Sequence, residues 1–418
     1  MEEFRRMNAI RSCALICSVL FVAGLGAAPP EAWIATWAAS PQRADPDPSE
    51  PLLILDDQTV RERVRVSIGG AAVRIRLSNE YGSAPLLVGA ATVAEPLDPA
   101  SVRPGSIHTV TFERKNSVAI PAGAAVLSDP VAFPVAQGAE ISISLYFPKR
   151  VGTATLHALA LKRAVVSQHG DQTRAEKIAA RAVSESLISV NAILVPAQPS
   201  QRLVVAFGDS VVDGDGATVD ADDNWPGDLI RRLGKTPKGA ALGVVNAGLA
   251  GNRLLSDGYG VSALARFDRD ALALPGVTHI VLLEGLNDIG FPGARLNGRY
   301  LADPADVRTP EDLIDAYRKL IARAHAHGVK LIGATISPFE GVDLPGYYSE
   351  PKEAVRQRVN NWIRTGGAFD AVIDFDAVLR DPDRPSRLLP RLASRDHLHP
   401  NPDGYRAMAG AIDLGVFK

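Results

Sequence analysis

The chain has 418 residues, of which 46% are hydrophobic, and its formal net charge at pH 7 is -2. A chain of this length and composition can form two globular domains with sizeable apolar cores. Because the charge is nearly balanced and no run of Lys or Arg occurs, we do not expect the chain to bind nucleic acid.

The first residues predict a secretory signal peptide. A basic start with Arg5, Arg6 and Arg11 precedes an apolar run at 13–23, which small residues follow. The alternative is a membrane anchor, but the run is short for a span and polar, Pro-containing sequence follows it at once. We therefore expect residues 1–28 to be removed and the mature chain to be secreted or periplasmic, without stable insertion in the membrane.

Both cysteines, Cys13 and Cys17, lie in this predicted signal peptide. The mature protein would then contain no cysteine. A disulfide or a metal site with cysteine ligands is therefore not expected.

Residues 30–198 are predicted to form a jelly-roll-like β-sandwich that precedes the second domain. Apolar residues alternate with polar ones at 64–68 and 73–77, on either side of Gly69-Gly70, which predicts a hairpin. Many short strands at regular spacing are typical of a sandwich. They are expected at 86–93, 107–112, 117–120, 141–147 and 154–161.

Residues 200–418 are predicted to form an α/β domain, with the junction at 196–200. Short apolar runs expected to be strands fall at 203–207, 243–246, 279–283, 329–335 and 371–374. Helix-like stretches separate or follow them at 225–233, 262–272, 309–327, 351–366 and 403–415. Repeated β-α units predict a parallel sheet with helices on both faces.

Polar residues follow three of these strands and occupy one late loop. They are Ser210 after the first strand, 246–252 after the second, 285–288 after the third, and Asp396 with His399 before the last helix. Ligands bind beyond the carboxyl ends of the strands in an open parallel sheet. Serine, aspartate and histidine in this chain order can supply a nucleophile, an orienting acid and the base that a serine hydroxyl needs.

Together these segments resemble the four blocks of the SGNH (GDSL-type) hydrolase superfamily, which implies a flavodoxin-like sheet for residues 202–418. Val211 stands where leucine is usual in that family, and a small apolar residue should pack similarly there. The opening 33–41, with the β-rich region behind it, resembles a two-domain secreted bacterial subgroup. Some members of that subgroup are grouped with xylan-associated acetylesterases.

The resemblance implies a role for each site residue. Ser210 would be the nucleophile, His399 the base, and Asp396 the acid that orients the imidazole. The backbone N–H groups of Ser210 and Gly251 and the side-chain amide of Asn287 would form the oxyanion hole. No metal and no organic cofactor is implied.

Each of these assignments has an alternative. His397 could replace His399 as the base, and Gly248 could replace Gly251 as the donor. Ser210 could be a helix cap and Asn287 part of an Asx turn. Five aspartates between 213 and 223 could bind calcium, but their spacing does not fit the calcium-loop pattern, so a solvated acidic loop is the expectation.

We therefore expect a serine carboxylic-ester hydrolase that acts through an acyl-enzyme on a small-molecule or polysaccharide ester. The expected substrates are short acyl esters, such as acetyl groups on carbohydrate or small aryl and alkyl esters. One alternative is a carbohydrate-binding protein on a degenerate hydrolase scaffold. Another is an acyltransferase that uses the same acyl-enzyme. The sequence leaves the oligomeric state open.

Overall fold

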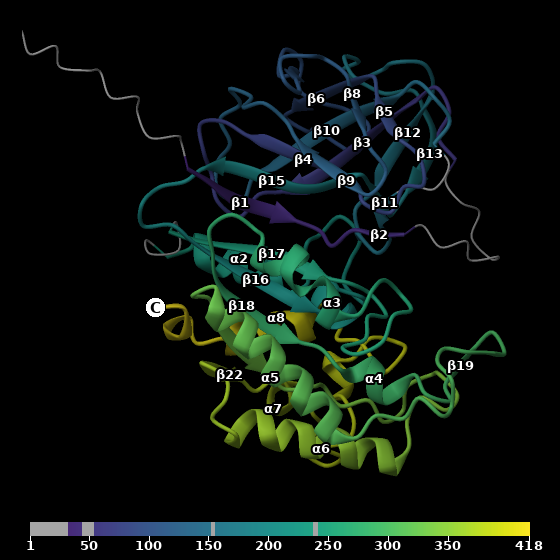
Figure 1. The fold of residues 1–418 in the computed structure, drawn as a ribbon, viewed down its shortest axis with the longest axis vertical. Helices are drawn as coiled ribbons and strands as arrows, with labels where there is room; N and C mark the ends of the chain where they lie inside the picture. The colour runs from purple at the N-terminus through teal and green to yellow at the C-terminus, as the bar shows by residue number, and fades with distance from the viewer. Residues whose placement is uncertain (1–31, 44–53, 152–154, 237–240) are drawn as a thin grey trace, which may run out of the picture. The chain divides into compact units, whose positions relative to one another are not determined.

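The structure, a computed structural model, describes residues 32–43, 54–151, 155–236 and 241–418. The predicted signal peptide, 1–28, and its two cysteines lie outside the described residues. Strands dominate as far as residue 196, and strands then alternate with helices to the end of the chain (Figure 1). Both regions belong to one compact unit, Ala32–Lys418.

Antiparallel sheets make up the first region. One has the strand order β1–β15–β4–β9, with bounds Trp33–Ala38, Val190–Pro196, Arg74–Asn79 and Ala124–Leu127. A second has the order β13–β12–β3–β10–β6–β7, with bounds Ala180–Ser184, Ala164–His169, Gln58–Arg65, Glu140–Phe147, Ala90–Ala94 and His108–Val110. Smaller sheets are β14–β11–β2 (Leu187–Ile188, Thr155–His157, Gln42–Arg43) and β5–β8 (Leu86–Val88, Val118–Ile120).

The two larger sheets share one apolar core. Val64 and Ile143 of the second sheet are buried in the same cluster as Ile75 and Ile193 of the first. Inward-facing residues of two antiparallel sheets form a core of this kind in a β-sandwich. The prediction of a strand-rich sandwich ahead of the α/β region is therefore confirmed.

The predicted hairpin around Gly69-Gly70 is wrong. β3 pairs with β10 and β12, whereas β4 pairs with β15 and β9, so the chain crosses from one sheet to the other. A Cβ on Gly69 would lie 2.6 Å from the carbonyl oxygen of Val135, and one on Gly70 would lie 2.8 Å from the Val195 side chain. These glycines therefore allow close packing at the crossing and do not close a two-residue turn.

The second region contains a five-stranded parallel sheet. Its order is β17–β16–β18–β21–β22, with bounds Leu242–Gly248, Arg202–Gly208, Val277–Leu283, Lys330–Ala334 and Ala371–Ile373. Every neighbouring pair is parallel. In chain order this is 2-1-3-4-5, the flavodoxin-like arrangement, and all five predicted strands are present.

Helices flank this sheet, and most lie where the sequence predicts them. They are α1 Ser210–Asp213, α2 Trp225–Gly234, α3 Ala263–Phe267, α4 Leu286–Gly290, α5 Pro310–Ala326, α6 Glu350–Thr365, α7 Phe375–Leu379 and α8 Pro402–Ala411. A π-helical turn, η2 (Asp268–Leu272), continues α3, and 3-10 turns occupy η3 (Pro390–Leu392) and η4 (Leu414–Phe417). β19 (Arg295–Leu296) and β20 (Arg299–Tyr300) form a small hairpin. No helix within the described ranges is long and apolar enough to cross a bilayer.

The parallel sheet separates two apolar cores. Along β16, Val205 and Phe207 belong to the core that contains α5 and α6, whereas Val204 and Ala206 belong to the core with α2 and α8. This division follows from the alternation of side chains along a strand. The first core continues into the sandwich, where Ile68 packs so closely on Gly243 that a Cβ there would lie 2.5 Å away.

Candidate active site

Ser210 lies at the carboxyl end of β16, between the neighbouring strands β17 and β18. It is the first residue of α1, and Asp209 caps that helix by accepting a hydrogen bond from the Val211 N–H at 3.0 Å. The second strand, β17, lies on one side of β16, whereas β18 and the later strands lie on the other side. The end of β16 is therefore the switch point at which open α/β sheets bind ligands.

One chain of hydrogen bonds links Ser210 to His399 and His399 to Asp396, the other two members of the predicted triad. The Ser210 hydroxyl lies 2.8 Å from Nε2 of His399, and Nδ1 of His399 lies 2.5 Å from Oδ2 of Asp396. Because a carboxylate only accepts, Nδ1 carries the proton and Nε2 is the acceptor that faces the serine. The alternative base His397 is exposed, with a left-handed backbone (φ 58°).

Asp396 is held as an anion. Its Oδ1 accepts hydrogen bonds from the Leu398 and His399 N–H groups at 2.9 and 3.0 Å and from the Ser394 hydroxyl at 2.5 Å. Burial alone would raise the pKa of Asp396, but the hydrogen bond and charge of His399, with these donors, lower it below its ordinary value. The carboxylate therefore stays charged and fixes the imidazole.

A second carboxylate, Asp215, faces the reacting nitrogen of His399. Its Oδ2 lies 3.7 Å from Nε2, and its side chain is 42% exposed. Burial of the ring lowers the pKa of His399, but the hydrogen bond that His399 donates to Asp396 and the negative charge of Asp215 outweigh burial, so the pKa lies above its ordinary value of 6.5. Both carboxylates favour the imidazolium that forms when the ring takes a proton.

The turn after β17 leaves one N–H free. The N–H groups of Gly248, Leu249, Ala250 and Asn252 donate to protein acceptors at 2.8 to 3.0 Å. The N–H of Gly251 has no acceptor among the described residues. Gly251 adopts a φ of +72°, which a residue with a Cβ rarely does, and a Cβ there would lie 2.7 Å from the Tyr259 ring.

Asn287 lies beside this turn with its amide fixed in one orientation. Its Nδ2 donates to the carbonyl of Asn252 at 2.9 Å, and its Oδ1 accepts a hydrogen bond from the Tyr347 hydroxyl at 2.8 Å. An amide nitrogen carries two N–H bonds, so one remains for another acceptor. The structure thus places the amide of Asn287 next to Gly251, as the sequence predicts for an oxyanion hole.

Arg266 ties together the strand ends that carry these groups. It is fully buried and donates to the carbonyls of Gly208 at 2.7 Å and Ala247 at 2.8 Å and to Oδ1 of Asn252 at 2.8 Å. The ends of β16 and β17 and the turn beyond them therefore share one guanidinium, which suits Arg because its donors have a fixed planar geometry.

Three buried acids also surround the site. Burial raises the pKa of Asp209 to about 7 and that of Asp288 to about 6, and it raises the pKa of Glu284 well above its ordinary value. Asp209 caps α1 and Asp288 accepts from the Leu254 and Leu255 N–H groups, so both hold loops in place.

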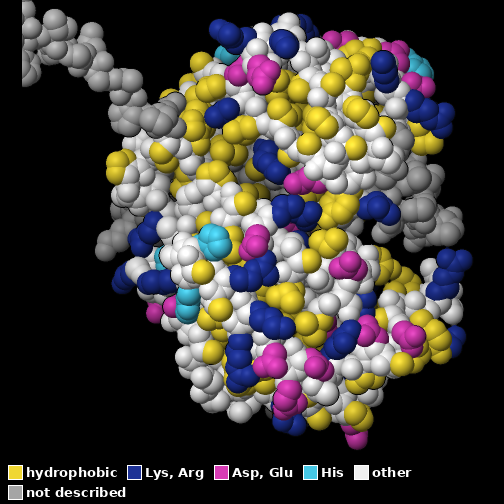
Figure 2. Space-filling model, in the orientation of Figure 1, with side chains coloured by type: hydrophobic (Ala, Val, Ile, Leu, Met, Phe, Trp, Pro, Cys, Tyr) yellow, Lys and Arg dark blue, Asp and Glu magenta, His cyan; other side chains and the backbone are white. Residues whose placement is uncertain are grey.

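The expectation of a solvated acidic loop at 213–223 is wrong for three of its five carboxylates. These pair with basic side chains of the β-rich region: Asp213 with His157, Asp220 with Arg63 and Arg163, and Asp222 with Arg65 and Lys162. The part of the chain that the structure describes contains no group of three or more His, Cys, Asp or Glu side chains arranged to hold a metal ion. Basic and acidic side chains are interspersed elsewhere too, on the face in Figure 2.

Sequence reasoning missed Tyr347, Arg266 and Asp215 as members of this site. Tyr347 and Arg266 are buried and contact the blocks from 60 and 14 residues away. Asp215 lies only five residues after Ser210 in the sequence. This proximity to the nucleophile was the one sequence signal for its place in the site.

Comparison with known proteins identifies one family model that matches the chain. Residues 206–407 match the model of the GDSL-like Lipase/Acylhydrolase family. A search of curated proteins found no match.

Solved structures similar to the chain include a G-D-S-L family lipolytic protein from Desulfitobacterium hafniense, at 22% identity over 50% of this chain and 97% of that chain, with a TM-score of 0.37. Others are the native aryl esterase of M. smegmatis (18%, 50% and 95%, 0.38) and a carbohydrate acetylesterase from Sinorhizobium meliloti (14%, 50% and 96%, 0.38). Residues 206–407 therefore form a GDSL-like lipase/acylhydrolase domain, and the protein is a carboxylic ester hydrolase.

Proposed function

We propose that the protein is a secreted serine ester hydrolase that forms an acyl-enzyme on Ser210. Its substrates are short acyl esters, either acetyl groups on carbohydrate or small aryl and alkyl esters. The observation that carries the proposal is the continuous hydrogen-bond chain from the Ser210 hydroxyl through His399 to Asp396. Secretion rests on the signal peptide predicted at 1–28.

In the first half of the reaction, Oγ of Ser210 attacks the ester carbonyl carbon while Nε2 of His399 takes the hydroxyl proton. The carbonyl oxygen becomes an anion, and it would accept from the N–H groups of Ser210 and Gly251 and the free N–H of Asn287. The C–O bond to the alcohol then breaks, and His399 returns its proton to the departing oxygen.

In the second half, water replaces the alcohol. His399 takes a proton from water as the water oxygen attacks the acyl carbon, and the same donors hold the second oxyanion. The bond to Oγ breaks, the proton passes back to Ser210, and the acid leaves. Asp396 keeps the proton of the neutral ring on Nδ1 throughout and stabilises the imidazolium.

An exposed aromatic ring supports the choice of substrate. Tyr259 is 44% exposed, lies against Gly251 and stacks edge-on with Phe291, with 6.0 Å between the ring centroids. A ring beside the oxyanion donors offers a flat apolar face to a sugar or an aryl group. The resemblance of the opening segment to acetylesterases favours acetyl as the acyl group.

The test compares the mature protein with Ser210→Ala on p-nitrophenyl acetate. We expect turnover by the mature protein and a loss of at least about 1000-fold in the variant. Equal turnover by the two would refute the nucleophile assignment.

Substrate choice is tested with p-nitrophenyl esters from acetate to palmitate, acetylated xylan and acetylated simple sugars. A preference for long chains would contradict the short-acyl proposal. Adding a free sugar distinguishes transfer from hydrolysis, because transfer would yield the acylated sugar in place of free acid.

For secretion, the full chain is expressed and the exported protein is sequenced from its N-terminus. Retention of residues 1–28 in the cell fraction would contradict export.

A further inference from the structure

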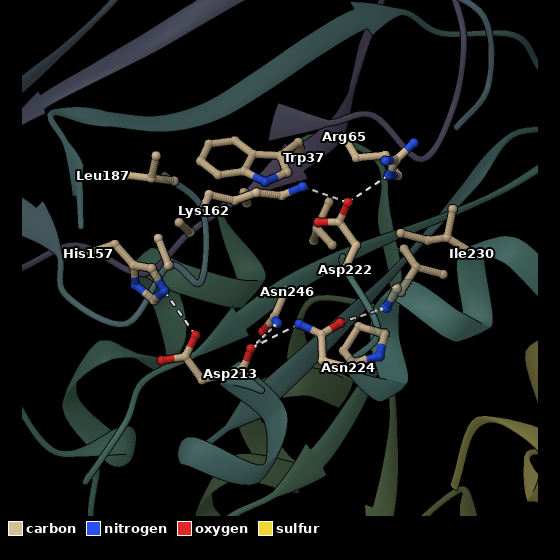
Figure 3. A pocket seen from close by; sticks show the side chains of 17 residues that line it. Trp37, Arg65, His157, Lys162, Leu187, Asp213, Asp222, Asn224, Ile230 and Asn246 are labelled. Atoms are coloured by element: carbon tan, nitrogen blue, oxygen red, sulfur yellow. Dashed lines mark hydrogen bonds and ion pairs between the residues drawn. The ribbon is translucent and has the colours of Figure 1, made fainter. Parts of the chain in front are cut away.

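Two consecutive hydrogen bonds connect the turn that contains Gly251 to the β-rich region. Ala250, the neighbour of Gly251, donates its N–H to Oδ2 of Asp213 at 2.9 Å, and Oδ1 of the same carboxylate lies 2.9 Å from Nε2 of His157. Figure 3 shows this His157–Asp213 pair at the edge of a cavity of about 80 Å³. His157 ends strand β11, and Asp213 ends the helix that Ser210 begins.

Asp213 contacts both His157 and the turn, so a movement of His157 would change the position of Ala250. The Asp213 side chain is 3% exposed, so both its contacts are shielded from water. Its own carbonyl accepts from the side chains of Asn224 and Asn246, each at 3.0 Å, which fixes the backbone from which the carboxylate projects. The remaining freedom of the carboxylate is therefore set by His157 and Ala250.

His157 is doubly protonated in this arrangement. Its Nδ1 lies 3.0 Å from the carbonyl oxygen of Ser40, and its Nε2 faces a carboxylate that already accepts from Ala250. Since both partners are acceptors, both ring nitrogens must donate. Burial and the charge of Arg266 lower the pKa of His157, but Asp213 and the Ser40 carbonyl outweigh them and raise it.

The placement of this pair favours a positioning role over a purely stabilising one. A buried ion pair is weak evidence for stability, because desolvation of the two charges offsets their attraction. Removing one member leaves the other charged and unpaired, and it then moves or recruits water. Here the group that would move is the acceptor of Ala250, one peptide before the Gly251 donor.

We propose that His157 is a positioning residue for the oxyanion hole: it orients Asp213, which holds Ala250 and thereby aims the N–H of Gly251 at the substrate. The β-rich region thus supplies part of the machinery that stabilises the transition state. The inference rests on the proposed function, since it requires that Gly251 bind the oxyanion.

The first test is His157→Phe, which keeps a ring of similar size and removes both donors. With p-nitrophenyl acetate we expect kcat to fall about 10- to 100-fold, with KM within about threefold, because the displaced donor acts mainly in the transition state. Circular dichroism and titration of Ser210 with a fluorophosphonate establish how much folded enzyme is present.

The matched variant is Asp213→Asn, which keeps an acceptor for Ala250 and lets a neutral His157 accept from the new amide. We expect its kcat to fall less than that of His157→Phe, because Ala250 keeps its acceptor. The parent should lose kcat as pH rises through the raised pKa of His157, because the neutral ring has only one N–H for its two acceptors, the Asp213 carboxylate and the Ser40 carbonyl. Asp213→Asn should lack that alkaline fall, which a merely structural contact would not remove.

The outcomes separate the two proposals. Parental kcat in folded His157→Phe would overturn this inference alone, provided that turnover still depends on Ser210. Should His157→Phe not fold, the alkaline pH profiles decide, and identical profiles for the parent and Asp213→Asn would overturn the inference. Turnover that survives Ser210→Ala would overturn the proposed function and this inference with it.

Discussion

The hydroxyl of Tyr347 donates a hydrogen bond to Oδ1 of Asn287 across 2.8 Å. Because Tyr347 is fully buried and burial raises its pKa well above the ordinary value, the phenol stays protonated and can act as a donor. An amide that receives a donor at Oδ1 must present its N–H groups on the other side. Tyr347 therefore determines which end of the Asn287 amide faces the proposed oxyanion.

Replacing Tyr347 with Phe keeps the ring, which packs against Phe291 and Phe339, and removes this hydrogen bond. A net contribution of about 0.5–1.5 kcal/mol predicts that kcat falls about 2- to 10-fold with little change in KM. In an Asn287→Ala background the second change should have no further effect on kcat. If Tyr347→Phe lowered kcat by the same factor in the Asn287→Ala background as in the parent, the proposal that Tyr347 acts through Asn287 would be contradicted.

The pH profile tests the role of Asp215. The base must be neutral to act, so kcat/KM should fall as pH drops below the pKa of His399, which lies above 6.5. Asp215→Asn removes a negative charge that favours the imidazolium, so the acid limb should move to lower pH. Because the carboxylate is 42% exposed, the movement should shrink at high salt. An unmoved limb would show that the 3.7 Å approach has no electrostatic effect.

Tyr259 is predicted to select flat leaving groups. Tyr259→Ala should raise KM for aryl acetates and acetylated sugars about 10-fold, corresponding to about 1.4 kcal/mol of lost ring contact, and leave KM for ethyl acetate nearly unchanged. Tyr259→Phe retains the ring and serves as the control. If the Ala variant raised KM equally for all three substrates, the ring would have no part in selectivity.

Lys352 is predicted to stabilise the loop that carries Tyr347. Its ammonium, which has three N–H donors, lies within 2.7 to 3.2 Å of four backbone carbonyl oxygens, those of Gly290, Pro292, Gly346 and Tyr347. Lys352→Met keeps the length of the side chain and leaves these oxygens without their donor, so the free energy of unfolding should fall by about 1–3 kcal/mol in urea titrations. In Lys352→Arg, which retains donors, the free energy of unfolding should fall less. Unchanged stability of the Met variant would mean that water replaces the ammonium without loss.

Sequence patterns predicted the α/β half well because its signals are local. Each strand of the sheet is a short apolar run. Helix α5 begins at Pro310, directly after Thr309, whose side chain accepts a hydrogen bond from the Asp312 N–H. The site could be located because the carboxyl ends of parallel strands must meet. The sequence therefore predicts that Ser210 and Asn287 lie at one edge of the sheet.

The misses all depend on contacts between distant parts of the chain. Alternation at 64–77 predicts two strands but does not specify their partners, which lie in different sheets. The aspartates at 213–223 look solvated in sequence because their cations come from strands more than 50 residues away. A single helix was expected at 262–272, whereas a π-helical turn begins at Asp268. The hydrogen bond from Arg269 of this turn to Tyr81 of the β-rich region is again a distant contact.

The apolar core that runs from the sandwich into one face of the parallel sheet bears on how the protein unfolds. Two halves that share buried side chains should lose their structure together, in a single calorimetric transition with a van't Hoff enthalpy equal to the calorimetric one. The change near residue 199 from antiparallel sheets to alternating strands and helices then falls within one cooperative folding unit. A β-rich segment of this kind cannot be exchanged among enzymes as a portable module, because removing it would open the core beneath Ser210.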